Sequence, residues 1–423
     1  MKTNFPVANL GDHVRQVSQR NKDESGTEVF SVTNSEGFTR STDYFSKEVF
    51  SKDISNYKVV RKGQFAYNPS RINVGSIDYL RPAEKALVSP LYVVFETDSE
   101  LSADYLLRYM KSDWGNAQIR ANTEGAVRDS LKYKGLERIK IPLPPLDDQK
   151  RIAHLLGKVE GLIARRKQHL RQLDDLLKSV FLEMFGNPVR NEKGWDLHSV
   201  NNFSESRLGK MRDKKFIKGA HLRKYLGNSN VQWFSFVFDE LLEMDFDERE
   251  REIFKLENGD LLVCEGGDIG RCAIWKNQIE DCYFQKALHR VRLDRNKAIP
   301  EYIQYVFLFY SLFNGFKITS KATIAHLTGE KLKATLIPLP PINIQNQFAA
   351  IVEKVEGLKS RYQQSLTDLE TLYGALSQKA FKGELDLSRV VLPVDSTTED
   401  TDNTEELNRE TREQRESKTG VAV

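Results

Sequence analysis

The sequence predicts a mixed α/β (α+β) protein in which two long antiparallel helices, paired as a coiled coil, separate two mixed α/β domains. The first observation is an internal duplication: the stretch from Ile141 to Phe185 returns 196 residues later, from Ile337 to Phe381, without a gap. The second is the seven-residue period of apolar residues in both copies, which is typical of a coiled-coil seam. The third is that the sequence ahead of each copy differs between the two halves. Together they predict a variable domain and a helix, each present twice and related by a pseudo-two-fold axis.

The composition is that of a soluble protein with two folded domains. A chain of 423 residues can bury a core in each of two medium-sized domains. The formal net charge of +3 is too small to identify a nucleic-acid-binding protein, so any basic surface must be local. The three cysteines match neither a disulfide framework nor a metal site and are expected as thiols in a reducing compartment. Because no apolar run is long enough to span a bilayer, we expect a cytoplasmic protein without membrane partners.

The duplication divides the chain into five segments. We predict a first variable domain at 1–140, a first spacer helix at 141–187, a second variable domain at 188–336, a second spacer helix at 337–387 and a disordered charged tail at 388–423. Within the variable domains, Gly63 and Gly259 precede strand-like runs at the same 196-residue separation. Short β-rich runs between glycine turns predict mixed α/β domains of common origin. The tail is rich in Thr, Glu, Asp and Arg and has few residues that could build a core.

Each spacer helix has a predicted start and end. The IPLPP run at the head of each copy is extended because proline excludes the helical conformation of the residue before it. Asp147 and Asn343 are expected at the N-caps, and Gly186 and Gly383 as the C-terminal stops. A helix of about 39 residues, roughly 58 Å long, needs a partner for its apolar stripe, and the nearest candidate is its duplicate.

The connectivity makes this pair antiparallel, because the second variable domain leaves the far end of the first helix and enters the start of the second. The two variable domains are therefore expected at opposite ends of the pair. One seam position is polar or half-polar in both copies, Arg166 and Tyr362, and is expected to set the register. The predicted seam consists of Ile152, Leu156, Val159, Ile163, Leu170, Leu173 and Leu177 in the first helix, and of Phe348, Val352, Val355, Leu366, Leu369 and Tyr373 in the second.

Three sequence patterns are similar to catalytic or cofactor-binding motifs but lack essential residues. Asn68-Pro69-Ser70-Arg71 lacks the second proline and the aromatic residue with which amino-methyltransferases hold a flipped adenine, so a plain turn is favoured. Asp148, in a string similar to part of a nuclease metal site, lies where a carboxylate stabilises the first helical turn. The glycine-rich run Gly266–Gly270 is not followed by the GK[ST] of a phosphate-binding loop. The sequence therefore predicts neither catalytic residues nor a bound metal.

Positive charge is concentrated in a few short segments, which predict contacts with double-stranded DNA. The richest segment begins at Lys210, where lysines and arginines alternate with aromatic residues. Clustered cations bind DNA by releasing its counterions, although a solvated basic loop remains the alternative. The segments around Arg128 and Thr323 occupy matching places ahead of the two helices and are second-tier candidates. The candidate DNA-binding residues are Arg15, Arg20, Lys22, Arg40, Ser41, Asn68, Ser70, Arg71, Asn73 and Arg128 in the first domain, and Lys210, Arg212, Lys214, Lys215, Lys218, Arg223, Lys224, Tyr225 and Thr323 in the second.

The order of variable domain, IPLPP run, shared glutamine (Gln149 and Gln345) and long amphipathic helix, present twice, resembles the specificity subunit of type I restriction-modification systems. The resemblance covers nearly the whole chain except the tail. It implies sequence-specific DNA binding by two target-recognition domains that read the two halves of a bipartite, asymmetric site. It also implies that Asp147–Phe185 and Asn343–Phe381 space these domains and dock two modification subunits, with restriction subunits completing the complex.

By the same resemblance, this chain is not an enzyme and binds no cofactor of its own. Its partners would supply adenine N6-methylation with S-adenosylmethionine, and DNA translocation and cleavage with ATP and Mg²⁺. Independently of any family, two unlike domains in inverted orientation predict half-site centres about one helical turn apart, roughly 34–36 Å. Two alternatives remain: a coiled-coil scaffold whose flanking domains bind proteins, and a stand-alone methyltransferase or nuclease.

Overall fold

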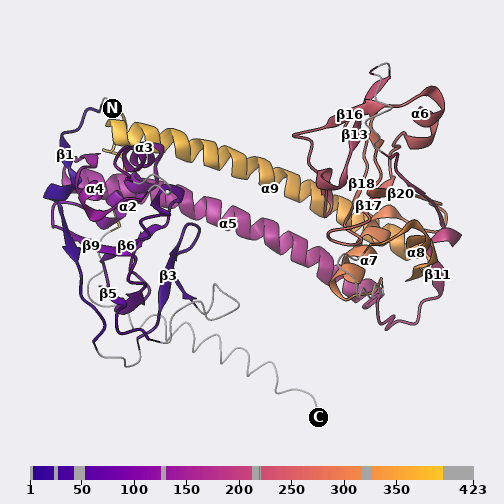
Figure 1. Ribbon diagram of the computed structural model, residues 1–423, viewed down its shortest axis with the longest axis horizontal. Coiled ribbons are helices and arrows are strands. Elements are labelled where there is room, and N and C mark those ends of the chain that lie inside the picture. Colours follow the sequence, from indigo (N-terminus) through magenta and orange to yellow (C-terminus); the bar gives the residue numbers. More distant parts are fainter. Residues whose placement is uncertain are drawn as a thin grey trace, which may run out of the picture. The chain divides into compact units, whose positions relative to one another are not determined.

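The computed structural model of the chain describes residues 3–22, 27–41, 53–124, 130–211, 219, 221–316 and 326–393. It contains both helices and sheets, which confirms the mixed class, and its two longest helices are α5 (Leu146–Phe185) and α9 (Ile342–Lys382) (Figure 1). The chain divides into two compact units, one formed by 1–164 with 368–423 and the other by 165–367. Each unit therefore contains one variable domain and a part of each long helix. No helix in the described ranges has the length and apolar character needed to cross a membrane.

The first unit is built on a four-stranded antiparallel sheet with the order β2-β9-β6-β7. Its strands are β2 (Val14–Val17), β9 (Val93–Thr97), β6 (Phe65–Tyr67) and β7 (Ile77–Tyr79). Three strand pairs accompany it, namely β1 (Val7–Asn9) with β10 (Lys140–Pro142), β3 (Phe30–Thr33) with β4 (Gly37–Arg40), and β5 (Lys58–Arg61) with β8 (Lys85–Val88). The helices are α2 (Ala103–Lys111), α3 (Asp113–Ala121) and α4 (Tyr133–Glu137). Apolar side chains of α2 share one core with the sheet and with both long helices.

The second unit repeats this plan with the sheet order β12-β20-β17-β18, again antiparallel. Its strands are β12 (Ser204–Leu208), β20 (Leu288–Leu293), β17 (Leu261–Cys264) and β18 (Cys272–Ile274). It also contains a sheet of β16 (Leu242–Asp245), β13 (Leu222–Leu226) and β19 (Tyr283–Phe284), and the pairs β11 (Leu197–Ser199) with β21 (Leu336–Pro338) and β14 (Val231–Gln232) with β15 (Ser235–Phe236). The helices are α6 (Glu248–Phe254), α7 (Pro300–Leu312) and α8 (Gly329–Ala334). Because the two central sheets have the same strand order, the duplication extends from the helices into the variable domains.

Left-handed glycines mark the same points in both central sheets. Gly63 (φ 84°) and Gly259 (φ 93°) stand just before the strands β6 and β17, and Gly75 (φ 90°) and Gly270 (φ 81°) close the loops that follow. Residues with a Cβ rarely adopt this conformation, so the turns favour glycine. The two domains therefore share loop geometry even where their side chains differ.

The long helices pack against each other in opposite directions within each unit. In the first unit, Ile152 near the start of α5 lies in one core with Ala380 near the end of α9. In the second unit, Leu177 near the end of α5 shares a core with Phe348 near the start of α9. An antiparallel pair is thus present in both units, stabilised by burial of the apolar seam. The predicted seam residues are buried, except that Ile163, Leu170, Leu173, Leu369 and Tyr373 are half-buried.

Both long helices begin two residues earlier than the predicted N-caps imply, at Leu146 and Ile342. The carbonyl oxygen of Pro145 accepts a hydrogen bond from the backbone N–H of Gln149 at 3.0 Å, which closes the first turn of α5. Asp147 therefore lies inside that turn, where its charge stabilises the helix dipole, rather than at the N-cap. Asn343 takes the same place in α9. Proline can stand at a helix start because no intrahelical bond needs its missing N–H there, which explains the earlier start.

The predicted helix ends and the polar seam position agree with the structure. Gly186 (φ 73°) and Gly383 (φ 71°) follow α5 and α9 in the left-handed conformation. The guanidinium carbon of Arg166 lies 4.3 Å from the ring centre of Tyr362, so these two seam residues stack on each other. A shift of one helix along the other would separate them, and the contact therefore favours one register.

The glutamine shared by the two copies fastens each variable domain to its helix. Gln149 is buried, and its side-chain oxygen accepts a hydrogen bond from the N–H of Ser102 (2.9 Å) while its amide group donates to two backbone carbonyl oxygens. Gln345 is also buried and makes the equivalent three bonds, accepting from the N–H of Ile299 at 3.0 Å. Each bond satisfies a backbone group that would otherwise be unpaired in the protein interior.

The packed part of the chain extends beyond the predicted start of the tail at Ser388. Leu387 is buried, and Val390 is half-buried against the core of the first unit. At the other terminus, the Thr3 hydroxyl donates to the carbonyl oxygen of Phe381 at 2.9 Å and so satisfies one free carbonyl at the end of α9. The remaining tail residues, 394–423, lie outside the described residues.

Candidate nucleic-acid interface

Each central sheet has a loop that bonds to the backbone N–H of a leucine ahead of a short helix. In the first unit, the loop between β6 and β7 presents the carbonyl oxygen of Pro69 to the N–H of Leu131 at 3.0 Å. In the second unit, the loop between β17 and β18 presents the carbonyl oxygen of Glu265 to the N–H of Leu327 at 2.7 Å. Leu131 and Leu327 follow closely after the segments 125–129 and 317–325, which lie outside the described residues. The structure therefore ties the loop that contains the Asn68–Asn73 candidates to the backbone of Leu131.

The β6–β7 loop carries two side chains, Arg71 and Asn73, that have no partner among the residues the structure describes. Asn68 accepts a hydrogen bond from the N–H of Ser70 at 3.1 Å, so this asparagine shapes the turn that the sequence predicted. Arg71 is exposed and Asn73 is half-buried, and neither side chain bonds to any residue in the described ranges. Val74 is 56% exposed at the end of the same loop. It was not predicted from the sequence, because the candidates were selected by clusters of charged and polar residues. The loop thus offers an unused guanidinium, an unused amide and an apolar group.

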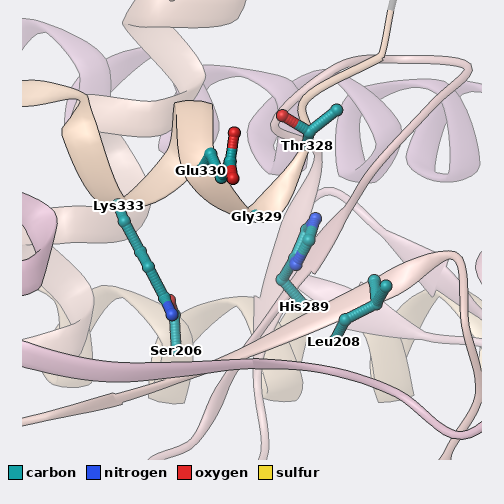
Figure 2. Close-up of a pocket in the computed structure, with 7 residues that line it drawn as sticks. All are labelled: Ser206, Leu208, His289, Thr328, Gly329, Glu330 and Lys333. Atoms are coloured by element: carbon teal, nitrogen blue, oxygen red, sulfur yellow. The ribbon is translucent and has the colours of Figure 1, made fainter.

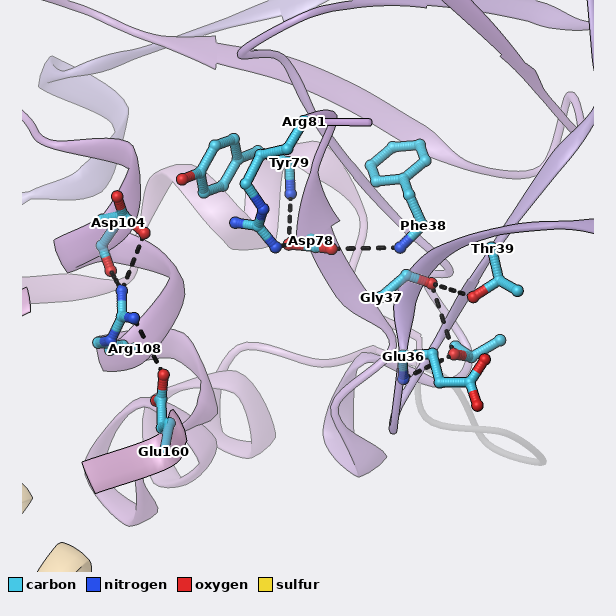
Figure 3. A network of polar contacts seen from close by, with 11 residues as sticks. Glu36, Gly37, Phe38, Thr39, Asp78, Tyr79, Arg81, Asp104, Arg108 and Glu160 are labelled. Carbon is cyan, nitrogen blue, oxygen red and sulfur yellow. Dashed lines mark hydrogen bonds and ion pairs between the residues drawn. The ribbon is translucent and has the colours of Figure 1, made fainter. Parts of the chain in front are cut away.

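The β3–β4 hairpin is held beside this loop by a buried carboxylate (Figure 3). Asp78 accepts hydrogen bonds from the N–H of Phe38 at 3.1 Å and from the guanidinium of Arg81 at 2.8 Å. Gly37 must lack a side chain, because a Cβ at this position would collide with the Asp78 carboxylate. At the hairpin tip, the side-chain oxygen of Asn34 reaches Gly75, which closes the β6–β7 loop. The hairpin tip and the loop therefore form one continuous surface.

The β17–β18 loop has the same position but the opposite charge. Its Asp268 side chain is 65% exposed and lies 3.4 Å from Nη1 of Arg271, whose Nη2 donates to the carbonyl oxygen of Asn228 at 3.1 Å. Gly266 and Gly270 leave room for His326 and Phe316, the residues on either side of segment 317–325. Sequence analysis excluded this glycine-rich run as a phosphate-binding loop but did not select it for DNA contact. The 196-residue spacing to the Asn68 loop was the available signal.

The predicted basic run of the second domain is partly neutralised. Lys210 pairs with Glu250 at 2.5 Å and also donates to the carbonyl oxygen of Asp245. Arg223 pairs with Asp281 at 2.8 Å, whereas Lys224 is exposed. Such pairing reduces the charge that these residues could offer to phosphate groups. Four further candidates, Arg212, Lys214, Lys215 and Lys218, and also Arg128 and Thr323, lie outside the described residues.

Two candidates are buried and cannot face a ligand in this conformation. Tyr225 is 3% exposed and packs with Phe246 and Tyr283, so the ring is a core residue. Ser41 is 5% exposed, and its hydroxyl lies 3.1 Å from that of Ser31. Alternating aromatic and cationic residues are equally typical of a strand with one buried face, which is what β13 is.

The remaining first-domain candidates lie on other strands and largely have partners. Arg15 forms an ion pair with Glu96 of the neighbouring strand β9. Arg20 donates a hydrogen bond to the side-chain oxygen of Asn56 at 3.0 Å, and Arg40 pairs with Glu28 at 2.9 Å. Lys22 is exposed. The structure does not bring these side chains together with the β6–β7 loop by any described bond.

A cavity of about 370 Å³ in the second unit is lined by Ser206, Leu208, His289, Thr328, Gly329, Glu330 and Lys333 (Figure 2). Burial lowers the pKa of His289, whose Nε2 lies 2.9 Å from the carbonyl oxygen of Leu327. A neutral imidazole then donates to that oxygen. In the first unit, the Tyr67 hydroxyl donates to the carbonyl oxygen of Leu131 at 3.1 Å instead. The carbonyl oxygens of Leu131 and Leu327, which have equivalent places in the two domains, thus accept hydrogen bonds from different side chains.

The residue that lines this cavity at Gly329 differs between the two domains. Tyr133 stands 196 residues before Gly329 in the sequence, and both begin a short helix, α4 and α8. The Tyr133 hydroxyl donates to the carbonyl oxygen of Val14 at 3.2 Å, whereas Gly329 lines the cavity without a side chain.

Comparisons with known proteins agree with this architecture. The family described as "Type I restriction modification DNA specificity domain" matches residues 16–174 and 212–368. The chain is 25% identical over 315 residues to the type I restriction enzyme EcoKI specificity subunit of Escherichia coli, covering 69% of this chain and 68% of the relative. It is 24% identical over 309 residues to the StySPI specificity subunit of Salmonella potsdam, covering 67% of this chain and 66% of the relative. The matched parts thus span about two thirds of these relatives.

Solved structures show the same fold at low sequence identity. A chain from a structure described as "Structural basis underlying complex assembly and conformational transition of the type I R-M system" superimposes with a TM-score of 0.57 at 17% identity, covering 91% of this chain and 100% of that chain. The type I restriction-modification system S subunit from M. genitalium superimposes with a TM-score of 0.54 at 12% identity, covering 90% and 96%.

Proposed function

This chain belongs to the type I restriction modification DNA specificity family, and from that premise we propose that it selects the DNA target of a type I restriction-modification complex. The observation that carries the proposal is the duplication of the whole unit. Two domains with one fold present equivalent loops whose side chains differ, as two readers of two different half-sites would. A bipartite, asymmetric target follows. A scaffold that binds only proteins would not need free base-reading side chains such as Arg71 and Asn73.

The paired helices offer a surface for the other subunits, because their two edges differ. One edge of the helix pair, the side on which Glu160 lies, contacts the variable domain. Glu160 accepts a hydrogen bond from Arg108 of α2 at 2.9 Å (Figure 3). It also accepts one from Tyr373 of α9 at 2.7 Å. Three heptads further along α5, Phe181 occupies the same heptad position and stacks on Tyr302 of α7 in the second unit. This edge is therefore already occupied.

Leucines occupy the other edge and remain exposed. Leu162 and its repeat mate Leu358 are 48% and 43% exposed, and Leu176 and its mate Leu372 are both 46% exposed. Single exposed leucines are ordinary, but a set repeated at the same heptad position in both helices is not. Next to Leu162 and Leu358 stand Gly161 and its mate, where an added Cβ would meet nothing within 4 Å.

Each unit contains one leucine of each helix at the same level. In the first unit, the Glu160–Tyr373 hydrogen bond places Leu162 level with Leu372. In the second unit, the ion pair of Asp174 with Lys359 at 2.8 Å places Leu176 level with Leu358. We infer that each of these pairs docks one modification subunit, so that one chain takes two. Replacement of all four leucines by glutamate should abolish assembly with the modification subunit while the chain still binds DNA. Assembly that stays intact would exclude this surface.

We propose that the chemistry is supplied by these partners and by restriction subunits. Among the described residues, no group of three or more His, Cys, Asp or Glu side chains is arranged to hold a metal ion. S-adenosylmethionine, ATP and Mg²⁺ would then be cofactors of the partner subunits, and this chain would contribute target selection alone. An activity assay of the purified chain with S-adenosylmethionine, and with Mg²⁺, separates this assignment from a stand-alone methyltransferase or nuclease.

The function is tested by mapping adenine methylation across the host genome with and without this gene. The expected result is the loss of one split motif in the deletion strain and its return on complementation. The same set of methylated motifs in both strains would contradict the proposal. Retention of the purified chain on DNA should also fall steeply with added salt, since phosphate contacts release counterions.

A further inference from the structure

We propose that the β6–β7 and β17–β18 loops are the base-reading loops of the two domains, and that they read opposite chemistry. Arg71 and Asn73 would read the acceptor-rich edge of purines in one half-site, and Asp268 would read an exocyclic amino group in the other. This inference rests on the proposed function and adds the residues that determine specificity.

The two loops are equivalent in backbone structure, which makes their side chains comparable. Both follow the central strand of the four-stranded sheet, and both close on a left-handed glycine, Gly75 or Gly270. Both also accept a hydrogen bond from the N–H of a leucine ahead of a short helix, Leu131 or Leu327, through a backbone carbonyl. A domain pair derived by duplication is expected to approach its ligand with the same edge.

The first loop carries hydrogen-bond donors that no described residue accepts from. Arg71 is exposed without an ion pair in the described ranges, although most of the neighbouring arginines, such as Arg81 and Arg108, are paired. In the major groove, arginine binds the O6 and N7 atoms of guanine, and asparagine binds the N6 and N7 atoms of adenine. Val74, exposed at the end of the loop, has the apolar character that contacts a thymine methyl group.

The second loop carries an acceptor where the first carries donors. Asp268 is 65% exposed, and its contact with Arg271 is long, at 3.4 Å, so one carboxylate oxygen remains free for a ligand. A carboxylate is repelled by phosphate groups, and a DNA-facing loop tolerates it where it accepts a hydrogen bond from a base. In the major groove the donors are N4 of cytosine and N6 of adenine. Asp268 therefore indicates a cytosine or adenine in the second half-site.

The first test replaces Arg71 in the full chain, assembled with its modification subunits in a host that lacks the native gene. Arg71→Ala should extend methylation to sites that differ at a single position of one half-site, with discrimination at that position reduced by about 5- to 150-fold. The other half-site should not change. Arg61→Ala, which removes an exposed arginine of β5 outside the loop, is the matched control and should leave the motif intact.

The pattern of loss in Arg71→Ala separates base reading from phosphate binding. Base reading predicts relaxation at one position, whereas a phosphate contact carries no sequence information and predicts an equal loss at all sites. An equal loss at all sites without a change of motif would overturn the assignment. Thermal unfolding of Arg71→Ala should match that of the unchanged chain because the side chain makes no described contact.

The second test uses Asp268→Asn, with Asp239→Asn as the control for loss of an exposed negative charge in the same domain. The expected result is relaxed preference at one position of the second half-site in Asp268→Asn alone. An unchanged motif in Asp268→Asn would contradict base reading by Asp268 without contradicting the proposed function. Failure of the unchanged complex to methylate any split motif would instead remove the proposed function itself.

Discussion

The two copies of the same glutamate, Glu160 and Glu356, are held in different ways. Glu160 accepts hydrogen bonds from Arg108 of the variable domain and from Tyr373 of the partner helix. Glu356 pairs with Lys359 of its own helix at 2.8 Å, and that lysine also pairs with Asp174. The difference shows that duplication preserved the helix and that the contacts around it diverged.

The divergence extends to the whole junction between variable domain and helices. In the first unit, the junction includes a polar network that links Asp104, Arg108 and Glu160 (Figure 3), and Tyr105 and Tyr109 of α2 also pack edge-on against Phe381 of α9. In the second unit, Tyr305 stands on α7 near Glu356, and Phe181 stacks on Tyr305 and Phe309. The first junction should therefore respond to salt as well as to loss of apolar volume, whereas the Phe181 stack should respond to loss of apolar volume. Four experiments can break or sharpen this comparison.

The largest effect is expected for Phe181→Ala in the aromatic junction. Phe181 is fully buried, and its removal leaves a cavity that should lower the unfolding free energy of the second unit by about 3–5 kcal/mol. Hydrogen exchange followed peptide by peptide in urea measures each unit separately. Leu182→Ala, at a position that is 38% exposed, is the control. A loss below about 1 kcal/mol for Phe181→Ala would show that the ring stack does not hold this junction.

The second effect concerns a feature in which the two units agree. Gln149→Ala and Gln345→Ala should each destabilise their own unit by about 1–3 kcal/mol, because buried backbone groups lose their partners. The two losses should be similar, since both glutamines make the same three bonds. A large loss in one unit and none in the other would mean that only one junction depends on this bond set.

The third effect tests the polar character of the first junction. Arg108→Ala removes ion pairs with Asp104 and Glu160, whose side chains are 51% and 41% exposed, and should cost the first unit about 1 kcal/mol at low salt. At about 1 M salt the difference should shrink, because screening acts over roughly 3 Å. Tyr305→Leu in the second unit should show no such salt dependence. Equal salt dependence of the two variants would remove the distinction between the junctions.

The smallest effect is a pH dependence of the second unit. Burial opposes the charge of Lys359, but its hydrogen bonds to Asp174 and Glu356 outweigh burial and raise its pKa above 10.5. A raised folded-state pKa stabilises the fold below the unfolded pKa, and this stabilisation is lost as the pH rises through the folded value. The reference variant is Lys359→Ile, which has the residue type of the repeat mate Ile163. Relative to this variant, the unfolding free energy of the unchanged chain should fall by up to about 1 kcal/mol above pH 10.5. A difference that is flat up to pH 12 would contradict the ion-pair assignment.

Sequence reasoning succeeded where one period governs many residues. The seam from Ile152 to Leu177 could be predicted because apolar residues recur there with a seven-residue period. The helix ends at Gly186 and Gly383 could also be predicted, because the left-handed conformation that ends a helix favours glycine. The helix starts were misplaced by two residues because Asp147 is as favourable within the first turn as at the cap.

The candidate interface was harder to predict, because it depends on partners that are distant in sequence. Lys210 is a free cation in the sequence, yet the fold brings Glu250 within 2.5 Å of it. Tyr225 belongs to an apparently basic run, yet the pleat of β13 turns it into the core. Val74 and Asp268 became candidates only when their loops were seen to be equivalent.

The amino-acid order alone determined the doubled plan of this protein, the length and ends of its paired helices and the family to which it belongs. Those properties depend on local propensity and on periodicity, which act within one stretch of chain. Which cations remain free, which loops lie side by side and how each junction is held were decided by tertiary structure. They depend on charge pairing and burial between residues far apart in the sequence, as in the bond of Glu160 to Tyr373, 213 positions away, and such distances carry no local signal.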